Sequence, residues 1–303
     1  MDVSDTTTAT HPEAQPAAAV ETRRTVLITG CSSGIGHHAA HALQARGWRV
    51  FATCRKEADC ARLRSEGLES FLLDYQKTET IAAAVEEALR RSGGRLDALF
   101  NNGAFACPGA LEDLPTDGLR ELFEANFFGW HELTRRVIPT MRAQGHGRIL
   151  QNSSVLGFTG LPMRGAYISS KFALEGYTDV LRLEMARAPI QVILIEPGPI
   201  KTQIRQNARP QYERWVKDLA PRSFWAETYR TVLEPRLYAE NPRPDLGELS
   251  CEATTRKVIH ALESRRPSTR YFVTSLTYAA ALGKRFLPTR WLDRALCGSW
   301  NKI

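Results

Sequence analysis

The stretch TVLITGCSSGIGHHAAHALQARGWRVFATC, residues 25–54, decides the fold. It begins with TVLITG, a β-branched apolar run that is typical of a strand buried in a parallel sheet. The following residues predict a turn, a helix and, at 48–54, a second strand. The turn holds Gly30, Gly34 and Gly36, and small residues there let backbone N–H groups at a helix N-terminus approach a pyrophosphate. A glycine-rich connection without a ligand is the alternative, but the order of elements favours a nucleotide-binding unit.

The alternation of strands and helices continues along the chain. Further strands are predicted at residues 69–73, 98–100, 148–151 and 191–196, and helices at 79–91, 116–141 and 166–187. This order predicts an α/β fold, a doubly wound parallel sheet of the Rossmann type in a single domain. Ligands of such sheets bind beyond the carboxyl ends of the strands. The segments that we expect at this edge are 30–36, Asp74, 101–104, 153–154 and 197–198.

A second stretch, QNSSVLGFTGLPMRGAYISSK at residues 151–171, carries side chains suited to proton transfer. Tyr167 and Lys171 are four residues apart, so in a helix they project from one face. We expect the Lys171 ammonium to lower the pKa of Tyr167 from its ordinary value of about 10, so that the phenol exchanges a proton near neutral pH. The Ser154 hydroxyl could bind the same substrate oxygen. A surface tyrosine beside a solvated lysine is the alternative unless the rest of the chain agrees.

Length and composition exclude several classes of protein. The 303 residues are 43% hydrophobic, enough for a substantial core, and carry a net charge of +7. A basic chain can bind nucleic acid, but zinc-finger spacing, an RNP-like motif and a dense basic run are all missing from the sequence. The six cysteines lack ladder or CxxC spacing, which predicts reduced thiols in a cytoplasmic protein and no metal site.

The first 23 residues are predicted to be a disordered tail. They are rich in Ala, Thr and Pro and contain no apolar segment of the kind that a secretory signal needs. The sequence also lacks an uninterrupted apolar stretch of about 18 residues, which argues against a spanning helix.

Residues 24–274 resemble the short-chain dehydrogenases/reductases. The motifs that carry the resemblance are TGCSSGIG at 29–36, Asp74, NNGA at 101–104, Asn126 in EANFFG, NSS at 152–154, Tyr167-x-x-x-Lys171 and EPGPIKT at 196–202. The family more often has NNAG where this chain has NNGA, and both variants keep small residues beside the cofactor. The chain is most similar to the branch that contains retinol and 17β-hydroxysteroid dehydrogenases and their bacterial relatives.

The resemblance implies four catalytic residues. Tyr167 would be the acid and base, Lys171 would hold the nicotinamide ribose and lower the Tyr167 pKa, Ser154 would orient the substrate oxygen, and Asn126 would support a water-linked proton path to Lys171. Besides Tyr167 and Lys171, the implied cofactor contacts are Gly30, Ser32, Ser33, Gly34, Ile35, Gly36, Asp74, Asn101, Gly103, Pro197, Gly198, Ile200 and Thr202. A hydrogen bond between helices is the alternative for Asn126, and an Asx turn is the alternative for Asp74.

Residues after the second strand predict which dinucleotide is bound. Folds that prefer NAD place an acid about 20 residues after the glycine turn, where it binds the adenosine 2′-hydroxyl. Here Arg55 and Lys56 follow the strand, and no acid precedes Glu57. A guanidinium can grip a 2′-phosphate with paired hydrogen bonds, so the pattern predicts NADP(H) over NAD(H). The alternative is that Arg55 opens the next helix in solvent.

The C-terminal third is expected to hold the substrate end of the protein. Apolar and aromatic residues at helical intervals over 203–246 predict added helices that either pack on the protein or roof an apolar pocket, with a loop at 241–246. A helix at 251–263 and a strand at 271–274 follow. Residues 275–303 interleave basic and apolar side chains, which predicts either a segment docked on the protein or peripheral contact with anionic lipid.

Together these features predict an NADP(H)-dependent oxidoreductase that interconverts a lipophilic ketone or aldehyde and its alcohol, with a steroid, retinoid or fatty aldehyde as substrate class. The family resemblance further implies a homodimer or homotetramer. A non-catalytic NADP(H)-binding sensor or scaffold on the same fold is the alternative. The set of Asn126, Ser154, Tyr167 and Lys171 argues against it, because a binding-only protein has no need of an aligned proton relay.

Overall fold

The computed structural model of the chain describes residues 23–300, with side chains as far as residue 298. The predicted disordered tail therefore lies, apart from residue 23, outside the described residues. Within the described range no helix has both the length and the apolar character that a bilayer crossing demands.

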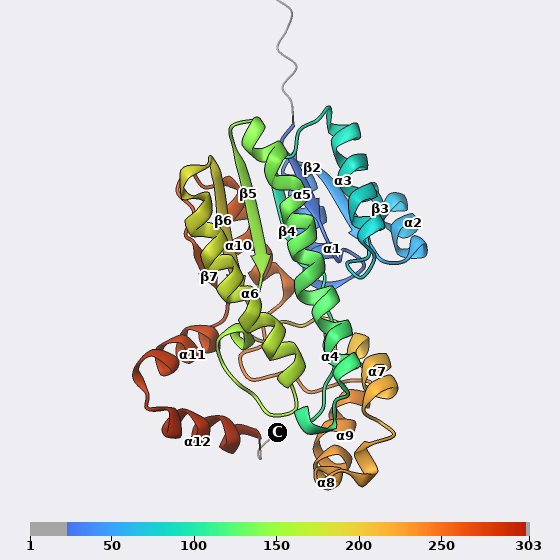
Figure 1. The fold of residues 1–303 in the computed structure, drawn as a ribbon, viewed down its shortest axis with the longest axis vertical. Coiled ribbons are helices and arrows are strands. Elements are labelled where there is room, and N and C mark those ends of the chain that lie inside the picture. The colour runs from blue at the N-terminus through green and yellow to red at the C-terminus, as the bar shows by residue number, and fades with distance from the viewer. Residues whose placement is uncertain (1–22, 301–303) are drawn as a thin grey trace, which may run out of the picture.

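A parallel sheet of seven strands forms the centre of the molecule (Figure 1). The strands are β1 (Thr25–Ile28), β2 (Arg49–Cys54), β3 (Glu69–Leu72), β4 (Ala98–Asn101), β5 (Gly147–Asn152), β6 (Ile190–Glu196) and β7 (Arg270–Phe272). They lie in the order β3-β2-β1-β4-β5-β6-β7, and every neighbouring pair is parallel. The doubly wound sheet predicted from the sequence is confirmed.

Helices cover both faces of the sheet and extend beyond its carboxyl edge (Figure 1). They are α1 (Gly34–Ala45), α2 (Glu57–Ser65), α3 (Thr78–Ser92), α4 (Thr116–Phe123), α5 (Gly129–Ala143), α6 (Gly165–Glu184), α7 (Ile204–Trp215), α8 (Ala226–Thr228), α9 (Glu234–Tyr238), α10 (Cys251–Glu263), α11 (Ser275–Phe286) and α12 (Thr289–Trp300).

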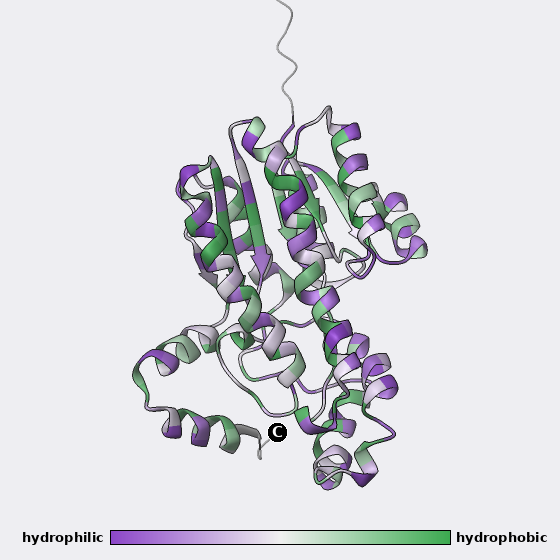
Figure 2. Ribbon diagram, viewed as in Figure 1, coloured by the Kyte–Doolittle hydropathy of each residue, from purple (hydrophilic) through white to green (hydrophobic). Residues whose placement is uncertain are grey.

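Strand side chains alternate between two hydrophobic cores. Leu27 and Phe51 belong to the core formed with α3, α5 and α6, whereas Val26 and Ile28 belong to the core formed with α1, α2 and α10. This division follows from the period of two along a strand. Because both faces are covered, the strands are apolar along most of their length, as Figure 2 shows.

The predicted helix at 116–141 is interrupted. It consists of α4 and α5, joined by a π-helical turn at Glu124–Phe128 that holds the buried Asn126. The side chain of Asn126 exchanges two hydrogen bonds with the main chain of Phe105, its Oδ1 accepting from N at 3.1 Å and its Nδ2 donating to O at 2.9 Å. Short π turns of this kind occur mostly at functional sites, where they re-aim one residue.

Two groups of helices flank the carboxyl edge of the sheet. Helices α7, α8 and α9 lie together on one side, and α11 and α12 extend on the other (Figure 1). The predicted strand at 271–274 ends earlier, at Phe272, because Thr274 caps α11 by accepting a hydrogen bond from the backbone N of Thr277. The predicted loop at 241–246 is irregular, as expected.

Candidate active site

A cavity of about 610 Å³ lies at the carboxyl ends of the strands. Its walls come from the turn after β1, the ends of β2 and β3, the loops after β4, β5 and β6, and the start of α7. Among the predicted site residues that line it are Gly30, Ser32, Ser33, Gly34, Ile35, Arg55, Asp74, Gly103, Ser154, Tyr167, Lys171, Pro197, Gly198, Ile200 and Thr202. The fold thus brings together segments that are far apart in the sequence.

The turn after β1 is built for close approach to a phosphate. Gly30 has a φ of 67°, and a Cβ there would lie 2.5 Å from the Cα of Gly103. A Cβ on Gly36 would lie 2.5 Å from the carbonyl oxygen of Gly30. Gly36 therefore allows the helix to pack closely against the turn, although it does not line the cavity. Helix α1 starts at Gly34. Because the Ser33 side chain does not cap the helix, it leaves the backbone N–H groups of the first turn available to a ligand. These features fit the pyrophosphate of a dinucleotide.

The structure places Asn102, and not the predicted Asn101, at the cavity wall. Asn101 is fully buried, and its amide donates at 3.0 Å to both Thr134 Oγ1 and Gln151 Oε1. Asn102 donates to the carbonyl oxygen of Thr29 and accepts from the amide of Asn152 at 2.9 Å. In the NNGA motif the two asparagines are adjacent, and only the end of β4 decides which one turns inward.

Ser154, Tyr167 and Lys171 converge as predicted. Ser154 follows β5, and its Oγ accepts a hydrogen bond from the backbone N of Leu156 at 3.1 Å. Tyr167 and Lys171 lie one turn apart on α6. The Lys171 ammonium donates to the carbonyl oxygen of Asn152 at 2.8 Å and lies 4.2 Å from the centroid of the Trp130 ring. The three side chains predicted to be catalytic therefore lie between α6 and the end of β5.

The pKa of Tyr167 is shifted opposite to our expectation. Desolvation in the cavity wall raises it to about 12, while a hydrogen bond with Ser154 and the charge of Arg164 act to lower it. Burial also lowers the pKa of Lys171 to about 7, although Glu175 acts to raise it. The prediction that Lys171 lowers the Tyr167 pKa is wrong here, because desolvation is the largest cause of the shift and the opposing effects come from Ser154 and Arg164. Tyr167 is thus a phenol at neutral pH.

Asn126 lies behind the cavity and does not line it. Its amide also donates to Ser170 Oγ at 3.3 Å, which adds a contact to α6. The hydrogen bond between helices that was the structural alternative is therefore present. The side-chain oxygen of Asn126 accepts from the N–H of Phe105, and its amide donates to Phe105 and Ser170, so the side chain is held by these two residues.

Arg55 and Asp74, the residues predicted to contact the adenosine half of a dinucleotide, both line the cavity. Arg55 is exposed, and Lys56 and Asp59 lie beside it in the cavity wall. Asp74 Oδ1 accepts from the backbone N of Gln76 at 3.1 Å, which is the Asx turn expected as its alternative role. The other oxygen of this half-buried carboxylate is not committed to that turn.

Sequence reasoning missed Arg164, which lines the cavity three residues before Tyr167. The residue before it, Met163, has a φ of 61° and is the one non-glycine residue with positive φ in the part of the chain that the structure describes. Its carbonyl oxygen accepts from the backbone N of Gly109 at 2.9 Å, which holds the strained turn in place. A single charged residue in the otherwise uncharged run between Gln151 and Tyr167 was the available signal.

A buried acidic group adjoins the proton-transfer residues. Glu175, one turn after Lys171, binds Arg270 at 2.6 Å, and Glu196 binds the same guanidinium nitrogen at 2.8 Å. Arg270 also binds both oxygens of Asp179 at 2.8 Å. Burial raises the pKa of Glu196 to about 8, and burial also raises the pKa of Glu175. One guanidinium thus faces three carboxyl groups, two of them buried.

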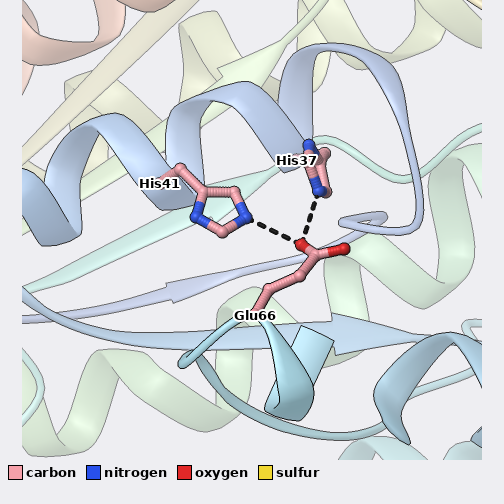
Figure 3. Close-up of side chains that lie close together, drawn as sticks. All are labelled: His37, His41 and Glu66. Carbon is pink, nitrogen blue, oxygen red and sulfur yellow. Dashed lines mark hydrogen bonds and ion pairs between the residues drawn. The ribbon is translucent and has the colours of Figure 1, made fainter. Parts of the chain in front are cut away.

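His37 and His41 of α1 and Glu66 after α2 form a separate cluster, shown in Figure 3. Both imidazole Nε2 atoms lie 2.8 Å from one Glu66 oxygen, and the other oxygen accepts from Arg62 at 2.6 Å. A hydrogen bond from His41 is the largest cause of a Glu66 pKa of about 2. These donors are of the type that holds a divalent ion, but they do not line the cavity. The hydrogen bonds join α1 to the end of α2.

Comparison with known proteins agrees with this geometry. The family model described as short chain dehydrogenase matches residues 24–213. The chain is 39% identical over 276 residues to the uncharacterized oxidoreductase YbbO of Escherichia coli (strain K12), covering 91% of this chain and 95% of that protein. It is 34% identical to 17-beta-hydroxysteroid dehydrogenase type 6 of Homo sapiens, covering 91% and 89%. It is 31% identical to NADPH-dependent 3-dehydrocapnine reductase of Ornithobacterium rhinotracheale, covering 92% and 98%.

A solved structure is also similar over most of the chain. A short-chain dehydrogenase from Streptomyces avermitilis superimposes with a TM-score of 0.69 and 26% identity, covering 92% of this chain and 97% of that one. The sequence motifs, the cavity and these relatives agree. The chain therefore belongs to the short-chain dehydrogenase family of oxidoreductases, in the branch that contains 17β-hydroxysteroid dehydrogenases and their bacterial relatives.

Proposed function

We propose that the protein is an NADP(H)-dependent carbonyl reductase and alcohol dehydrogenase for lipophilic substrates. The observation that carries the proposal is the convergence of Ser154, Tyr167 and Lys171 on one cavity that also contains the glycine turn. A dinucleotide bound there would place its pyrophosphate at the start of α1 and its nicotinamide near Pro197 and Thr202. When bound, the nicotinamide supplies or accepts the hydride.

The protein residues handle the proton. Ser154 would hold the substrate carbonyl oxygen, and the neutral Tyr167 phenol would donate its proton to that oxygen as negative charge develops on it. The raised pKa of Tyr167 keeps this proton in place at neutral pH and so supports the reductive direction. Lys171 would hold the ribose, and the main chain of the π turn at Asn126 would support reprotonation through water.

Preference for NADP(H) is supported by charge at the adenosine end. Arg55 and Lys56 line the cavity where the β2 strand ends, and the nearest acid in the wall, Asp59, lies 3.7 Å from Arg62. A 2′-phosphate would meet two cations there, whereas a 2′-hydroxyl would find no adjacent acid on β2. The relative from Ornithobacterium rhinotracheale, whose name records NADPH dependence, also supports this choice.

A lipophilic substrate is supported by the apolar side chains in the cavity wall. They include Leu161, Ile204, Leu246, Leu276 and Ala280. The names of relatives point to steroid and related carbonyl chemistry. Exposed Val180 and Leu183 on α6 offer an apolar surface to a second copy, which supports the homodimer or homotetramer that we propose. We further propose a cytoplasmic location, with peripheral lipid contact through α11 and α12.

Reductase activity separates this proposal from a binding-only sensor. The purified protein is mixed with NADPH and a panel of steroid ketones, retinaldehyde and medium-chain aldehydes, and NADPH oxidation is followed by absorbance. We expect steady turnover of at least one carbonyl and formation of the matching alcohol. Tight NADPH binding without turnover of any member of the panel would favour the sensor.

A further inference from the structure

Arg164 presents a cation to the substrate end of the cavity without a partner of its own. No hydrogen bond or ion pair of its side chain is found among the described residues, although the residue is half-buried. It lines the main cavity and also an adjoining apolar pocket of about 50 Å³. Burial lowers its pKa to about 10. A guanidinium that is desolvated in this way needs an anion to offset the cost.

The nearby charges supply that anion only in part, because the charge of Asp245 acts on Arg164 against those of Arg236 and Arg205. Arg205 and Arg236 line the same pocket, and both pair with a single acid, Asp245. Asp245 is thereby committed to two guanidinium groups through its two oxygens. Glu248 lies beside Asp245 and its charge also acts on Arg236, so three arginines face two acids and a surplus of positive charge remains at this end of the cavity.

The surroundings of Arg164 are otherwise apolar. The adjoining pocket is lined by Ala106, Met163, Ala208, Leu233 and Leu237, among others. An anion that binds here must therefore carry hydrocarbon. Arg164 directly precedes α6, and Tyr167 lies one turn further along the same cavity wall. An anion bound to Arg164 would therefore belong to the same substrate molecule as the carbonyl that Tyr167 protonates.

From this arrangement, and resting on the proposed function, we propose that the substrate is an amphipathic carbonyl compound whose acidic group binds Arg164. Carboxylate, sulfonate and phosphate share the required chemistry, because each offers two oxygens to one guanidinium. Arg164 then determines specificity: it binds one end of the substrate while Ser154 and Tyr167 act on the carbonyl. Neutral steroids or simple aldehydes of equal size would lack this contact.

A different role for Arg164 must be distinguished from this one. Its charge also acts to lower the pKa of Tyr167. If Arg164 served only to adjust the pKa of Tyr167, its loss would change turnover of charged and neutral substrates equally. It would also move the pH profile of kcat. If it binds an anionic group, its loss raises KM for charged substrates alone.

The test compares a long-chain ω-oxo fatty acid with its methyl ester, which share chain length and the reacting aldehyde. We expect wild type to favour the acid in kcat/KM by at least about tenfold, as a charge-assisted hydrogen bond of roughly 1.5–3 kcal/mol allows. Arg164→Gln should abolish that preference mainly through KM and leave the ester within about twofold. Arg164→Lys should restore part of it. Arg214→Gln, which removes a cation from α7 where it pairs with Glu121, should change neither substrate.

Binding of the unreactive fatty acid, measured by calorimetry with wild type and Arg164→Gln, tests the anion site without turnover. Tighter binding of the fatty acid than of its ester, lost in Arg164→Gln, supports the site even if no carbonyl is reduced and the proposed function fails. Equal loss for acid and ester, or a wild type indifferent to the carboxylate in both assays, overturns the proposal while leaving the reductase assignment intact.

Discussion

Tyr167 carries the proton that the proposed reaction needs. Tyr167→Phe removes the hydroxyl and keeps the ring, so turnover should fall by about a hundredfold or more while NADPH affinity changes little. Tyr177→Phe is the matched control, because Tyr177 lies on the same helix and its hydroxyl meets His131 outside the cavity. Steady-state kinetics and NADPH titration check both variants. Near-normal turnover in Tyr167→Phe contradicts the mechanism.

Arg55 should set the preference for the dinucleotide. Wild type should use NADPH better than NADH by about tenfold or more, since a charge-assisted phosphate contact contributes roughly 1.5–3 kcal/mol. Arg55→Ala should lose most of this preference by weakening NADPH alone, whereas Arg64→Ala, on α2 outside the cavity, should retain it. Comparison of kcat/KM for the two cofactors decides the matter. A wild type that prefers NADH overturns the assignment.

Single residues also show where prediction from sequence ends. Ser154, Tyr167 and Lys171 could be found because their spacing is local and their chemistry specific. The direction of the Tyr167 pKa could not, because it depends on how much protein surrounds the phenol, which the sequence does not display. The prediction chose Asn101, whereas Asn102 lines the cavity, for a similar reason: the length of the strand decides which of two adjacent side chains faces the cavity.

The C-terminal helices α11 and α12 present apolar side chains on an exposed surface. Phe286 and Trp291 are 70% and 65% exposed, and Lys284, Arg285 and Arg290 lie beside them in the sequence. We expect the full chain to bind vesicles of anionic lipid, and Phe286→Asp with Trp291→Asp to reduce binding at least about fivefold. Phe224→Asp, which changes a still more exposed aromatic residue (87%) near α8, is the control. Equal sedimentation of all three proteins with vesicles would show that α11 and α12 do not contact lipid.

Elements with a strong hydrophobic period were predictable, and their interruptions were not. The strands and α6 follow from apolar runs and from the helical spacing around Tyr167. The π turn at Glu124–Phe128 leaves no mark in that pattern, because it arises when Asn126 reaches the main chain of Phe105, 21 residues away. The short helix α9 is likewise joined to α7 by a long-range contact, in which the Tyr212 hydroxyl donates to Glu234.

The stability of the whole molecule should depend on pH through Glu196. Its pKa in the folded protein, about 8, lies above the ordinary value of 4.5, so the folded state binds more protons than the unfolded chain between these limits. Its contribution is fully present near pH 4.5 and is lost as the pH rises toward 8. Denaturant unfolding at pH 5 and pH 7 should show wild type losing on the order of 1–2 kcal/mol relative to Glu196→Gln. Parallel behaviour of the two proteins would contradict a protonated Glu196.

The strand order also bears on when Arg270 can bind Glu175 and Glu196 during folding. Strand β1 is central, while β7, the last strand in the chain, is an outer strand that pairs with β6 alone within the described sheet. Glu175 and Glu196 lie on elements that precede β7 in the chain, and Arg270 of β7 is the guanidinium that binds both of them. Until β7 docks, the two acids lack this partner, and their protonation relieves the repulsion between them. The final docking step of refolding should consequently be faster at pH 5 than at pH 8, and stopped-flow refolding of Glu196→Gln should lose that difference.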